Sequence, residues 1–310
     1  MEALPPDAGG PAAGAELIRR QCSHKEGFPL NVKIVTDSTA SIPAEICRSL
    51  HITVVPVVVH FGQETYIDGV NPAAEFYGRL GAAEQPPTTS TPSPGTFLET
   101  YRKLAADGAA IISIHLFETK SALINVARMA AKMLPESNIH IIDSQTTTLG
   151  LGLLTIAAAR AAAMGRAVGE IISYVESLVP HVHIHAAIRD LTQLRLSGRV
   201  SLGQAMVAGV LGIKPILYIG QGVADVVDRV RGWSRAVDHV VSMALERAGQ
   251  ARVFLAVVHT NAEAEARQLL DEVRSRFNCI ESIIADAGTG VATHAGPGAL
   301  GIVTLRVDQQ

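Results

Sequence analysis

The sequence predicts an α/β protein of two lobes, in which a doubly wound N-terminal lobe is followed by an α+β C-terminal lobe. From Val32 onward, short β-branched runs alternate with stretches of helical length, which is typical of βαβ units and a mainly parallel sheet. The turn Gly220-Gln221-Gly222 separates two later apolar runs, and strands joined by so tight a turn are antiparallel. A chain of 310 residues is long enough to form two cores.

The elements of the first half follow from the spacing of their apolar residues. Four runs rich in β-branched side chains are expected to be strands: Val32–Thr36, Ile52–Val59, Ala109–Ile114 and Ile139–Ile142. Four amphipathic stretches are expected to be helices: Pro43–Leu50, Pro72–Leu80, Pro94–Ala106 and Thr119–Leu134. The first three of these begin at a proline, which is a common start signal for a helix.

Two consecutive helices place the boundary between the lobes near Gly165. The segment Leu149–Met164 is apolar nearly all round, which predicts a buried helix, and Val168–Leu178 forms the next one. Residues 31–165 are therefore assigned to the N-terminal lobe and residues 166–310 to the C-terminal lobe. Residues 1–30 are rich in Pro, Gly and Ala and lack the features of a signal peptide, so we expect a disordered extension.

The second half mixes strands and helices without the regular alternation of the first. Its apolar runs predict strands at Val182–Ile188 and Val253–Val258, the hairpin at Gly220–Gly222, and closing strands near the end of the chain. Helices are expected around Leu191 and Leu202, and at Ser234–Ala248 and Ala262–Arg276.

The composition argues against several classes of function. With 4% aromatic residues and a net charge of -3, the chain lacks the stacking side chains and the positive field that nucleic-acid binding uses. Arg160 and Lys214 interrupt the longest apolar stretches, so no transmembrane segment is expected, although a transient membrane contact stays open. Cys22, Cys47 and Cys279 form neither a disulfide framework nor a thiolate zinc site, which is typical of a cytoplasmic protein.

Two segments of small residues, Thr88–Gly95 and Thr293–Gly301, are expected to be loops that hold a polar head group. The first offers hydroxyls and backbone N–H groups, and the second offers the imidazole of His294 among glycines. Further hydroxyls follow the predicted strands at Asp37–Thr39 and at Asp143–Thr148, where ligands collect in an open α/β sheet. Helix capping explains such residues equally well, so the alternatives stay open at this point.

Five motifs occur in the order in which they stand in the DegV family, and over Val32 to Val307 the chain resembles that family. They are TDSTASIP (Thr36–Pro43), TSTPSPG (Thr89–Gly95), LRLSGRVS (Leu194–Ser201), IKPIL (Ile213–Leu217) and HAGPGALG (His294–Gly301). The resemblance implies a Rossmann-like lobe and an α+β lobe that enclose one long-chain fatty acid in a buried tunnel. It also implies presentation of that fatty acid to a separate fatty acid kinase, with no cofactor and no catalysis by the chain itself.

The resemblance also implies which residues bind the head group of the fatty acid, because four residues stand at the family's positions for that role. Thr89 stands at the position of a carboxylate-binding hydroxyl with Ser90 beside it, while Arg199 and His294 come from the C-terminal lobe. We expect the tunnel to be lined by apolar residues such as Ile114, Leu149, Leu153, Ile156 and Met206.

One segment departs from the family pattern. Where the family has a sequence like LSGTY, with a serine that holds the carboxylate, this chain has Leu116–Lys120, so Phe117 takes the serine position and Glu118 the glycine position. A phenyl ring donates no hydrogen bond, and a nearby carboxylate repels another one. Either the head group is held more by the four residues above, with Thr119 as a further candidate, or the ligand has a different, uncharged polar end.

A different class of function stays open, because a histidine can also act as a nucleophile. In that alternative His294 accepts a phosphoryl or acyl group, as in a phosphocarrier or a transferase. His181, His183 and His185 alternate along a predicted strand and share one face, but no acidic or fourth ligand is evident nearby, so no metal site is expected. The segment from Gly150 lacks the third glycine of a dinucleotide fingerprint.

Overall fold

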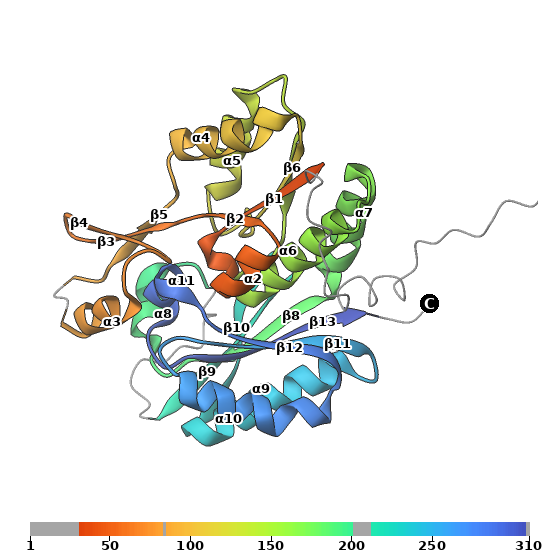
Figure 1. The fold of residues 1–310 in the computed structure, drawn as a ribbon. Helices are drawn as coiled ribbons and strands as arrows, with labels where there is room; N and C mark the ends of the chain where they lie inside the picture. The colour runs from red at the N-terminus through yellow and green to blue at the C-terminus, as the bar shows by residue number, and fades with distance from the viewer. Residues whose placement is uncertain (1–30, 83–84, 201–211, 308–310) are drawn as a thin grey trace, which may run out of the picture.

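The computed structural model describes residues 31–82, 85–200 and 212–307, and its elements form alternating helical and sheet layers (Figure 1). The first sheet consists of β1 (Val32–Asp37), β2 (Ile52–Val55), β6 (Ala110–His115) and β7 (Ile139–Asp143). Its order is β2-β1-β6-β7 and all of its strands are parallel. Helices cover both faces, as a doubly wound sheet requires.

The helices of this lobe separate into two groups. Helices α4 (Pro94–Leu104) and α5 (Leu123–Lys132) pack on the outer face of the sheet, with Phe97 and Tyr101 fully buried there. On the inner face lie α2 (Ala44–Ser49), α6 (Thr148–Ala163) and α7 (Val168–Leu178). The predicted start of α5 at Thr119 was wrong, because the helix begins at Leu123 and a turn and a bend precede it.

A three-stranded antiparallel sheet branches from the first lobe and was not predicted. It consists of β3 (Val58–Phe61), β4 (Glu64–Ile67) and β5 (Thr88–Ser90), in the order β4-β3-β5, with α3 (Ala73–Ala82) packed against it. The prediction of one strand over Ile52–Val59 was wrong, since Pro56 lies between β2 and β3. Proline has no N–H to give to a strand ladder, so the chain leaves one sheet there and enters the next.

The C-terminal lobe is built on a six-stranded mixed sheet. Its strands are β8 (Val182–Ala187), β9 (Ile213–Gly220), β10 (Val223–Arg231), β11 (Arg252–His259), β12 (Asn278–Asp286) and β13 (Leu300–Val307). The order is β10-β9-β8-β13-β11-β12, and every pair is antiparallel except β11 with β12. Helices α9 (Trp233–Ala248) and α10 (Glu263–Val273) cover the outer face. The predicted hairpin is confirmed, because Gln221 and Gly222 join β9 to β10.

Helix α6 lies between the two large sheets and packs against both (Figure 1). The prediction that it is buried all round is confirmed. A Cβ atom on Gly152 would stand 2.5 Å from the carbonyl oxygen of Ala40, and one on Gly150 would stand 3.0 Å from Val182. These two glycines therefore let the helix approach both lobes closely, which is a packing role and not a nucleotide-binding one.

Two shorter helices stand beside the junction of the lobes: α8 (Leu191–Ser197) and α11 (Gly288–Ala295). The described residues also form four 3-10 turns: η1 (Ser38–Ala40), η2 (Ala105–Asp107), η3 (Val179–His181) and η4 (Arg274–Arg276). The extension over residues 1–30, the helix expected around Leu202 and the side chain of Met206 lie outside the described residues. The assignment of residues 31–165 and 166–310 to two domains stays a prediction.

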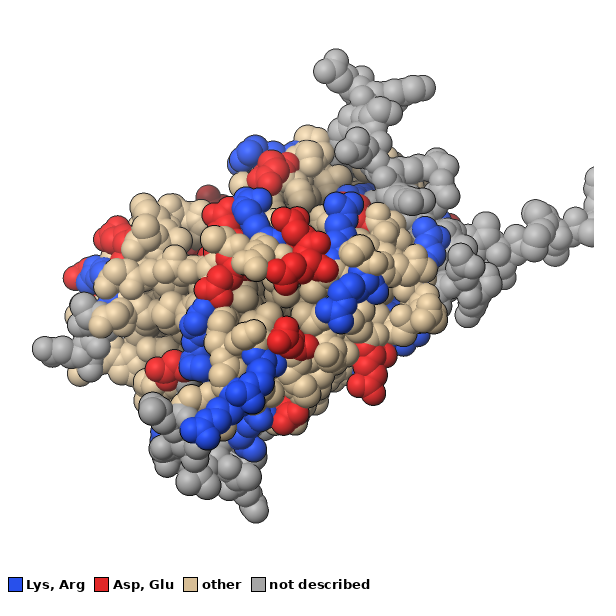
Figure 2. All heavy atoms as spheres, turned by 90° about the horizontal axis from the view of Figure 1, so that it is seen from below, with Lys and Arg blue, Asp and Glu red and all other residues tan. Residues whose placement is uncertain are grey.

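Helix length and surface charge are the two features of the described residues that concern membranes and nucleic acids. Among those residues, no helix is both long and apolar enough to cross a membrane. On the face of the molecule seen in Figure 2, basic and acidic side chains lie interspersed among uncharged ones. A face of mixed sign does not itself create the positive field that steers nucleic acids.

Candidate binding cavity

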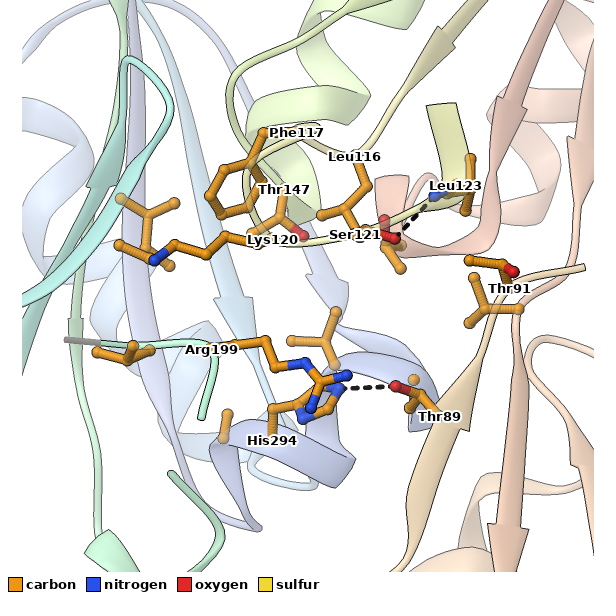
Figure 3. A pocket seen from close by; sticks show the side chains of 18 of the residues that line it. Thr89, Thr91, Leu116, Phe117, Lys120, Ser121, Leu123, Thr147, Arg199 and His294 are labelled. Carbon is orange, nitrogen blue, oxygen red and sulfur yellow. Dashed lines mark hydrogen bonds between the residues drawn. The ribbon is translucent and has the colours of Figure 1, made fainter. Parts of the chain in front are cut away.

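A cavity of about 450 Å³ lies where the two lobes meet (Figure 3). Its polar wall comes from hydroxyl, imidazole, amine and guanidinium side chains: Thr39, Thr89, Ser90, Thr91, Lys120, Ser121, Thr147, Arg199 and His294. Its apolar wall comes from both lobes as well: Val57, Leu116, Phe117, Leu123, Leu194, Val200, Leu217, Ile219, Ala224 and Val291. A volume of this size is typical of a pocket for a small organic ligand.

Thr89 and His294 meet at the polar end of the cavity. Thr89 Oγ1 lies 3.0 Å from His294 Nε2, although 205 positions separate the two residues in the chain. Thr89 belongs to β5, and His294 lies in the last turn of α11. Figure 3 shows the guanidinium group of Arg199 directed at the same point. The structure therefore brings together three of the four residues that the sequence assigns to the head group.

The imidazole of His294 is uncharged at neutral pH. Burial, and to a smaller extent the positive charge of Arg199, lower its pKa to about 4. Nδ1 is buried without a hydrogen-bond partner among the described residues. Because a buried N–H without an acceptor is costly, the tautomer with the proton on Nε2 is favoured. In that tautomer Nε2–H donates to Thr89 Oγ1, and the threonine hydroxyl can donate its own proton to a ligand oxygen.

Helix α11 is held in place from the other lobe. The carboxylate of Asp68, which follows β4, accepts hydrogen bonds from Thr289 N at 2.7 Å and from Thr289 Oγ1 at 2.9 Å, in the first turn of the helix. Ser41 Oγ donates to the carbonyl oxygen of Ala287, just before the helix, at 3.0 Å. A carboxylate at this end satisfies free N–H groups and complements the helix dipole. These contacts set the position of His294.

The expectation that the segment from Thr293 to Gly301 is a loop was wrong in its first part. Thr293, His294 and Ala295 are helical, and the chain leaves the helix at Gly296, whose φ of +72° suits glycine. The segment over Thr88–Gly95 was likewise expected to be a loop, yet its first three residues form β5. Both head-group residues thus lie on regular elements, which fixes them more firmly than loops would.

The apolar end of the cavity continues toward the sheet of the C-terminal lobe. A second cavity of about 60 Å³ shares four wall residues with the first: Leu217, Ile219, Val291 and Ala295. Its remaining walls include small and apolar residues of β8, β11 and β13: Ile184, Ala186, Val258, Leu300 and Gly301. The smaller space therefore adjoins the larger one at a mostly apolar wall.

Four of the five residues expected to line this tunnel do not line it, and the fifth, Met206, lies outside the described residues. Ile114, Leu149, Leu153 and Ile156 do not line the cavity, but pack in the core between the two large sheets with exposed fractions of 0–2%. A fully apolar helix between two sheets fills space with its own side chains. The cavity lies instead beside the ends of the strands, where Thr39 and Thr147, two of the hydroxyl residues that follow strands, line its wall.

Ser90 and Thr119 each have a hydrogen-bond partner of their own. Ser90 lines the cavity, and its hydroxyl lies 2.8 Å from His60 Nε2. The side chain of Thr119 is outside the cavity and donates to the carbonyl oxygen of Gly222 at 2.8 Å, which links the two lobes. Thr89 is therefore the hydroxyl of these three that meets His294.

The departure at Phe117 and Glu118 has a different consequence at each position. Phe117 is buried and adds an apolar surface to the cavity wall. Glu118 does not line the cavity, and its carboxylate pairs with Arg128 at 2.6 Å. The expected repulsion between Glu118 and a bound carboxylate is therefore absent, because an outward-facing ion pair holds that charge. Lys120 also lines the cavity. Sequence reasoning missed it because it takes the tyrosine position of the family segment LSGTY, to which no head-group role was assigned.

A buried chain of hydrogen bonds supports the same wall. His115 Nδ1 and Leu116 N each lie 3.0 Å from the carboxylate of Asp37, and His115 Nε2 lies 2.6 Å from Ser113 Oγ. The arrangement has the order of a Ser-His-Asp triad, but the three polar residues have exposed fractions of 0% and do not line the cavity. Its role is to fix Leu116, a wall residue, at the end of β6.

Comparison with known proteins agrees with the motif order. The family model described as "Uncharacterised protein, DegV family" matches residues 31–307. The chain belongs to the DegV family. A DegV domain-containing protein of Streptomyces coelicolor is 33% identical to it over 275 residues, which are 88% of this chain and 98% of that protein.

Solved structures of other DegV proteins share the fold. The crystal structure of DegV from Bacillus subtilis, described as a fatty acid binding protein, superimposes with a TM-score of 0.80 at 30% identity and covers 90% of this chain and all of that one (100%). A DegV family protein from Thermus thermophilus, described by its fatty acid binding, superimposes with a TM-score of 0.82 at 26% identity, covering 89% of this chain and 99% of that one.

Proposed function

We propose that this DegV chain binds one long-chain fatty acid in the cavity between its lobes. The observation that carries the proposal is a polar cluster of Thr89, His294 and Arg199 at one end of a cavity whose other end is apolar. An amphiphile with a charged head and an alkyl tail matches this distribution of groups. The fatty acids described for the related Bacillus and Thermus proteins support the same ligand class.

The tail supplies most of the binding free energy. Each buried CH₂ group contributes about 0.8 kcal/mol, so a long acyl chain supplies on the order of 10 kcal/mol before the costs of association. In this proposal the tail runs past Leu217 and Ile219 toward the smaller cavity. Most residues that line the smaller cavity are apolar, so the tail itself imposes little selectivity on the head group.

The head group is selected by hydrogen bonds and charge. The hydroxyl of Thr89 accepts a hydrogen bond from His294 Nε2–H and donates its own proton to one carboxylate oxygen. The guanidinium of Arg199 supplies the opposite charge. Hydrogen bonds to a charged group contribute about 1.5–3 kcal/mol each, whereas an unpaired carboxylate in a closed cavity is strongly penalised. A free acid is thus favoured over a ligand with an uncharged end.

A carrier role agrees better with this geometry than a transferase role for His294. A nucleophilic imidazole needs an accessible nitrogen, but Nδ1 is sealed and Nε2 is engaged with Thr89. In this proposal the chain holds the fatty acid without a cofactor and presents it to a separate fatty acid kinase. The kinase partner and a cytoplasmic location rest on the family resemblance and on the cysteine usage.

The proposal is tested by comparing hexadecanoic acid with hexadecan-1-ol in displacement of a fluorescent fatty acid. We expect the acid to bind at least about tenfold more tightly, because it alone forms charge-assisted hydrogen bonds. Arg199→Gln narrows the difference in affinity between the acid and the alcohol. Arg195→Gln, a control on the exposed side of α8, leaves that difference unchanged. Equal binding of the alcohol would show that the natural head group is uncharged, and failure of both to bind would refute the proposal.

A further inference from the structure

A second large cavity, of about 640 Å³, lies on the outer side of the C-terminal sheet and shares no residue with the first. Its walls are mostly polar or charged: Pro180, His181, His183, His185, Gln221, Met243, Glu246, Arg247 and Arg306. His183 and His185 alternate along β8 with Ile184, which faces the inner core. The two imidazoles therefore lie on the face that α9 covers.

The floor of this cavity is a preorganised group of rings. His183 Nδ1 lies 3.0 Å from the hydroxyl of Tyr218, and both His183 and His185 stack or tilt against the Tyr218 ring, with centroids 6.0 and 5.4 Å away. The guanidinium of Arg247 stands 5.7 Å from the centroid of the same ring and donates to its hydroxyl at 3.5 Å. The tyrosine thus holds two imidazoles and one arginine in fixed positions.

These hydrogen bonds direct donors into the cavity. Because Arg247 donates to the Tyr218 oxygen, the tyrosine O–H can donate to His183 Nδ1, and the proton of that imidazole is then on Nε2. In His185, which is 4% exposed, Nδ1 is sealed without a partner among the described residues. Its Nε2 is therefore the nitrogen that can reach a ligand.

Basic side chains outnumber acidic ones among the residues that line the cavity. Arg247 and Arg306 contribute two guanidinium groups, against the single carboxylate of Glu246. Burial and the positive charge of Arg247 lower the pKa of both His183 and His185 to about 4, so the imidazoles are neutral donors at pH 7. Within the described ranges, no group of three His, Cys, Asp or Glu side chains is placed to hold a metal ion.

We propose that this cavity is an anion site that binds the phosphate group of a small molecule, with Arg247 and Arg306 as its charged contacts and His183 and His185 as its neutral donors. Guanidinium groups match phosphate oxygens in geometry and charge. The free volume beyond one phosphate leaves room for the organic part of a phosphate ester. Nothing in this site depends on the proposed binding of a fatty acid, because the two cavities lie on opposite faces of the sheet.

The test is an NMR titration of the protein carrying isotope-labelled histidine, with inorganic phosphate and with glycerol phosphate as probes at constant ionic strength. We expect saturable shifts of the His183 and His185 imidazole signals with both probes, and a rise in their pKa, because a bound anion favours the imidazolium form. Arg247→Met weakens binding at least about tenfold, as expected for the loss of a charge-assisted contact.

Arg235→Met, on an exposed turn of the same helix, is the matched control and leaves the affinity unchanged. The far-UV circular dichroism spectrum and the thermal unfolding midpoint of the Arg247 variant report whether its fold is intact. The proposal is overturned if phosphate causes no saturable shift, if Arg235→Met weakens binding as much as Arg247→Met, or if zinc ions and not phosphate shift the two imidazoles. A response to inorganic phosphate alone, without one to glycerol phosphate, overturns the ester-binding part.

Discussion

Thr89 and His294 show how much a single residue's role depends on a distant partner. The order of the motifs was enough to predict that both residues serve one head group. It could not predict that they share a hydrogen bond across 205 positions, or that Ser90 meets His60. Neighbouring side chains of a strand point to opposite faces, which separates Ser90 from Thr89. Because β5 has only three residues, its sequence does not predict a strand.

The substitution Thr89→Val removes the shared hydroxyl with little change in shape. We expect it to weaken binding of hexadecanoic acid by about tenfold to a hundredfold, since one charge-assisted hydrogen bond is lost. Thr89→Ser keeps the hydroxyl and most of the affinity. Isothermal titration calorimetry measures both.

Thr88→Val is the matched control for this prediction. Thr88 neighbours Thr89 on β5 but does not line the cavity, so its replacement leaves the affinity unchanged. If Thr89→Val binds hexadecanoic acid as tightly as the wild type does, the hydroxyl is not a head-group contact.

At the scale of elements, long and strongly patterned segments were predicted well and short ones were not. Helix α6 and the hairpin after β9 follow directly from an apolar run and a glycine turn. The small sheet was missed because β5 has three residues and β4 carries only one buried side chain. Such strands are specified by their neighbours and not by their own sequences.

Gly152 tests the packing of α6 between the lobes. We expect Gly152→Ala to lower the free energy of unfolding by about 1–3 kcal/mol, because the new methyl group would collide with the backbone carbonyl of Ala40. Gly169→Ala in α7 is the matched control, since its Cβ would meet nothing within 4 Å. There the same change should be stabilising by up to about 1 kcal/mol. Urea unfolding of both variants checks the prediction, and a stabilised Gly152→Ala would contradict it.

The whole molecule should lose stability as the pH falls below neutral. The pKa values of His183, His185 and His294 are lowered to about 4, whereas the ordinary value is 6.5. Below pH 6.5 the unfolded chain therefore takes up protons that the folded chain does not. The stability that these groups contribute is present above pH 6.5 and is lost as the pH falls toward about 4.

Each such histidine contributes a slope of up to about 1.4 kcal/mol per pH unit in this window. We expect His185→Gln to reduce the slope of unfolding free energy against pH by up to about 1.4 kcal/mol per pH unit, which corresponds to one proton. Urea unfolding at several pH values between about 5 and 7 measures it. An unchanged slope would mean that His185 is protonated in the folded protein as readily as in the unfolded chain.

The position of the cavity is the property of the whole molecule that the sequence could not supply. Apolar residues such as Leu149 look the same in a sequence whether they fill a core or line a tunnel, and here they fill the core. What places the cavity is the meeting of two lobes, with Phe117 on one side and Leu217 on the other. Only the relative position of the lobes decides which apolar side chains are left facing empty space.

The most direct test of the central claim is a crystal structure of the protein with ω-bromohexadecanoic acid, in which anomalous scattering locates the bromine. We predict a bromine peak at the apolar end, near Leu217 and Ile219, and a carboxylate within hydrogen-bonding distance of Thr89 Oγ1. A bromine peak outside the space between the lobes, or a carboxylate at another wall of the cavity, would contradict the account.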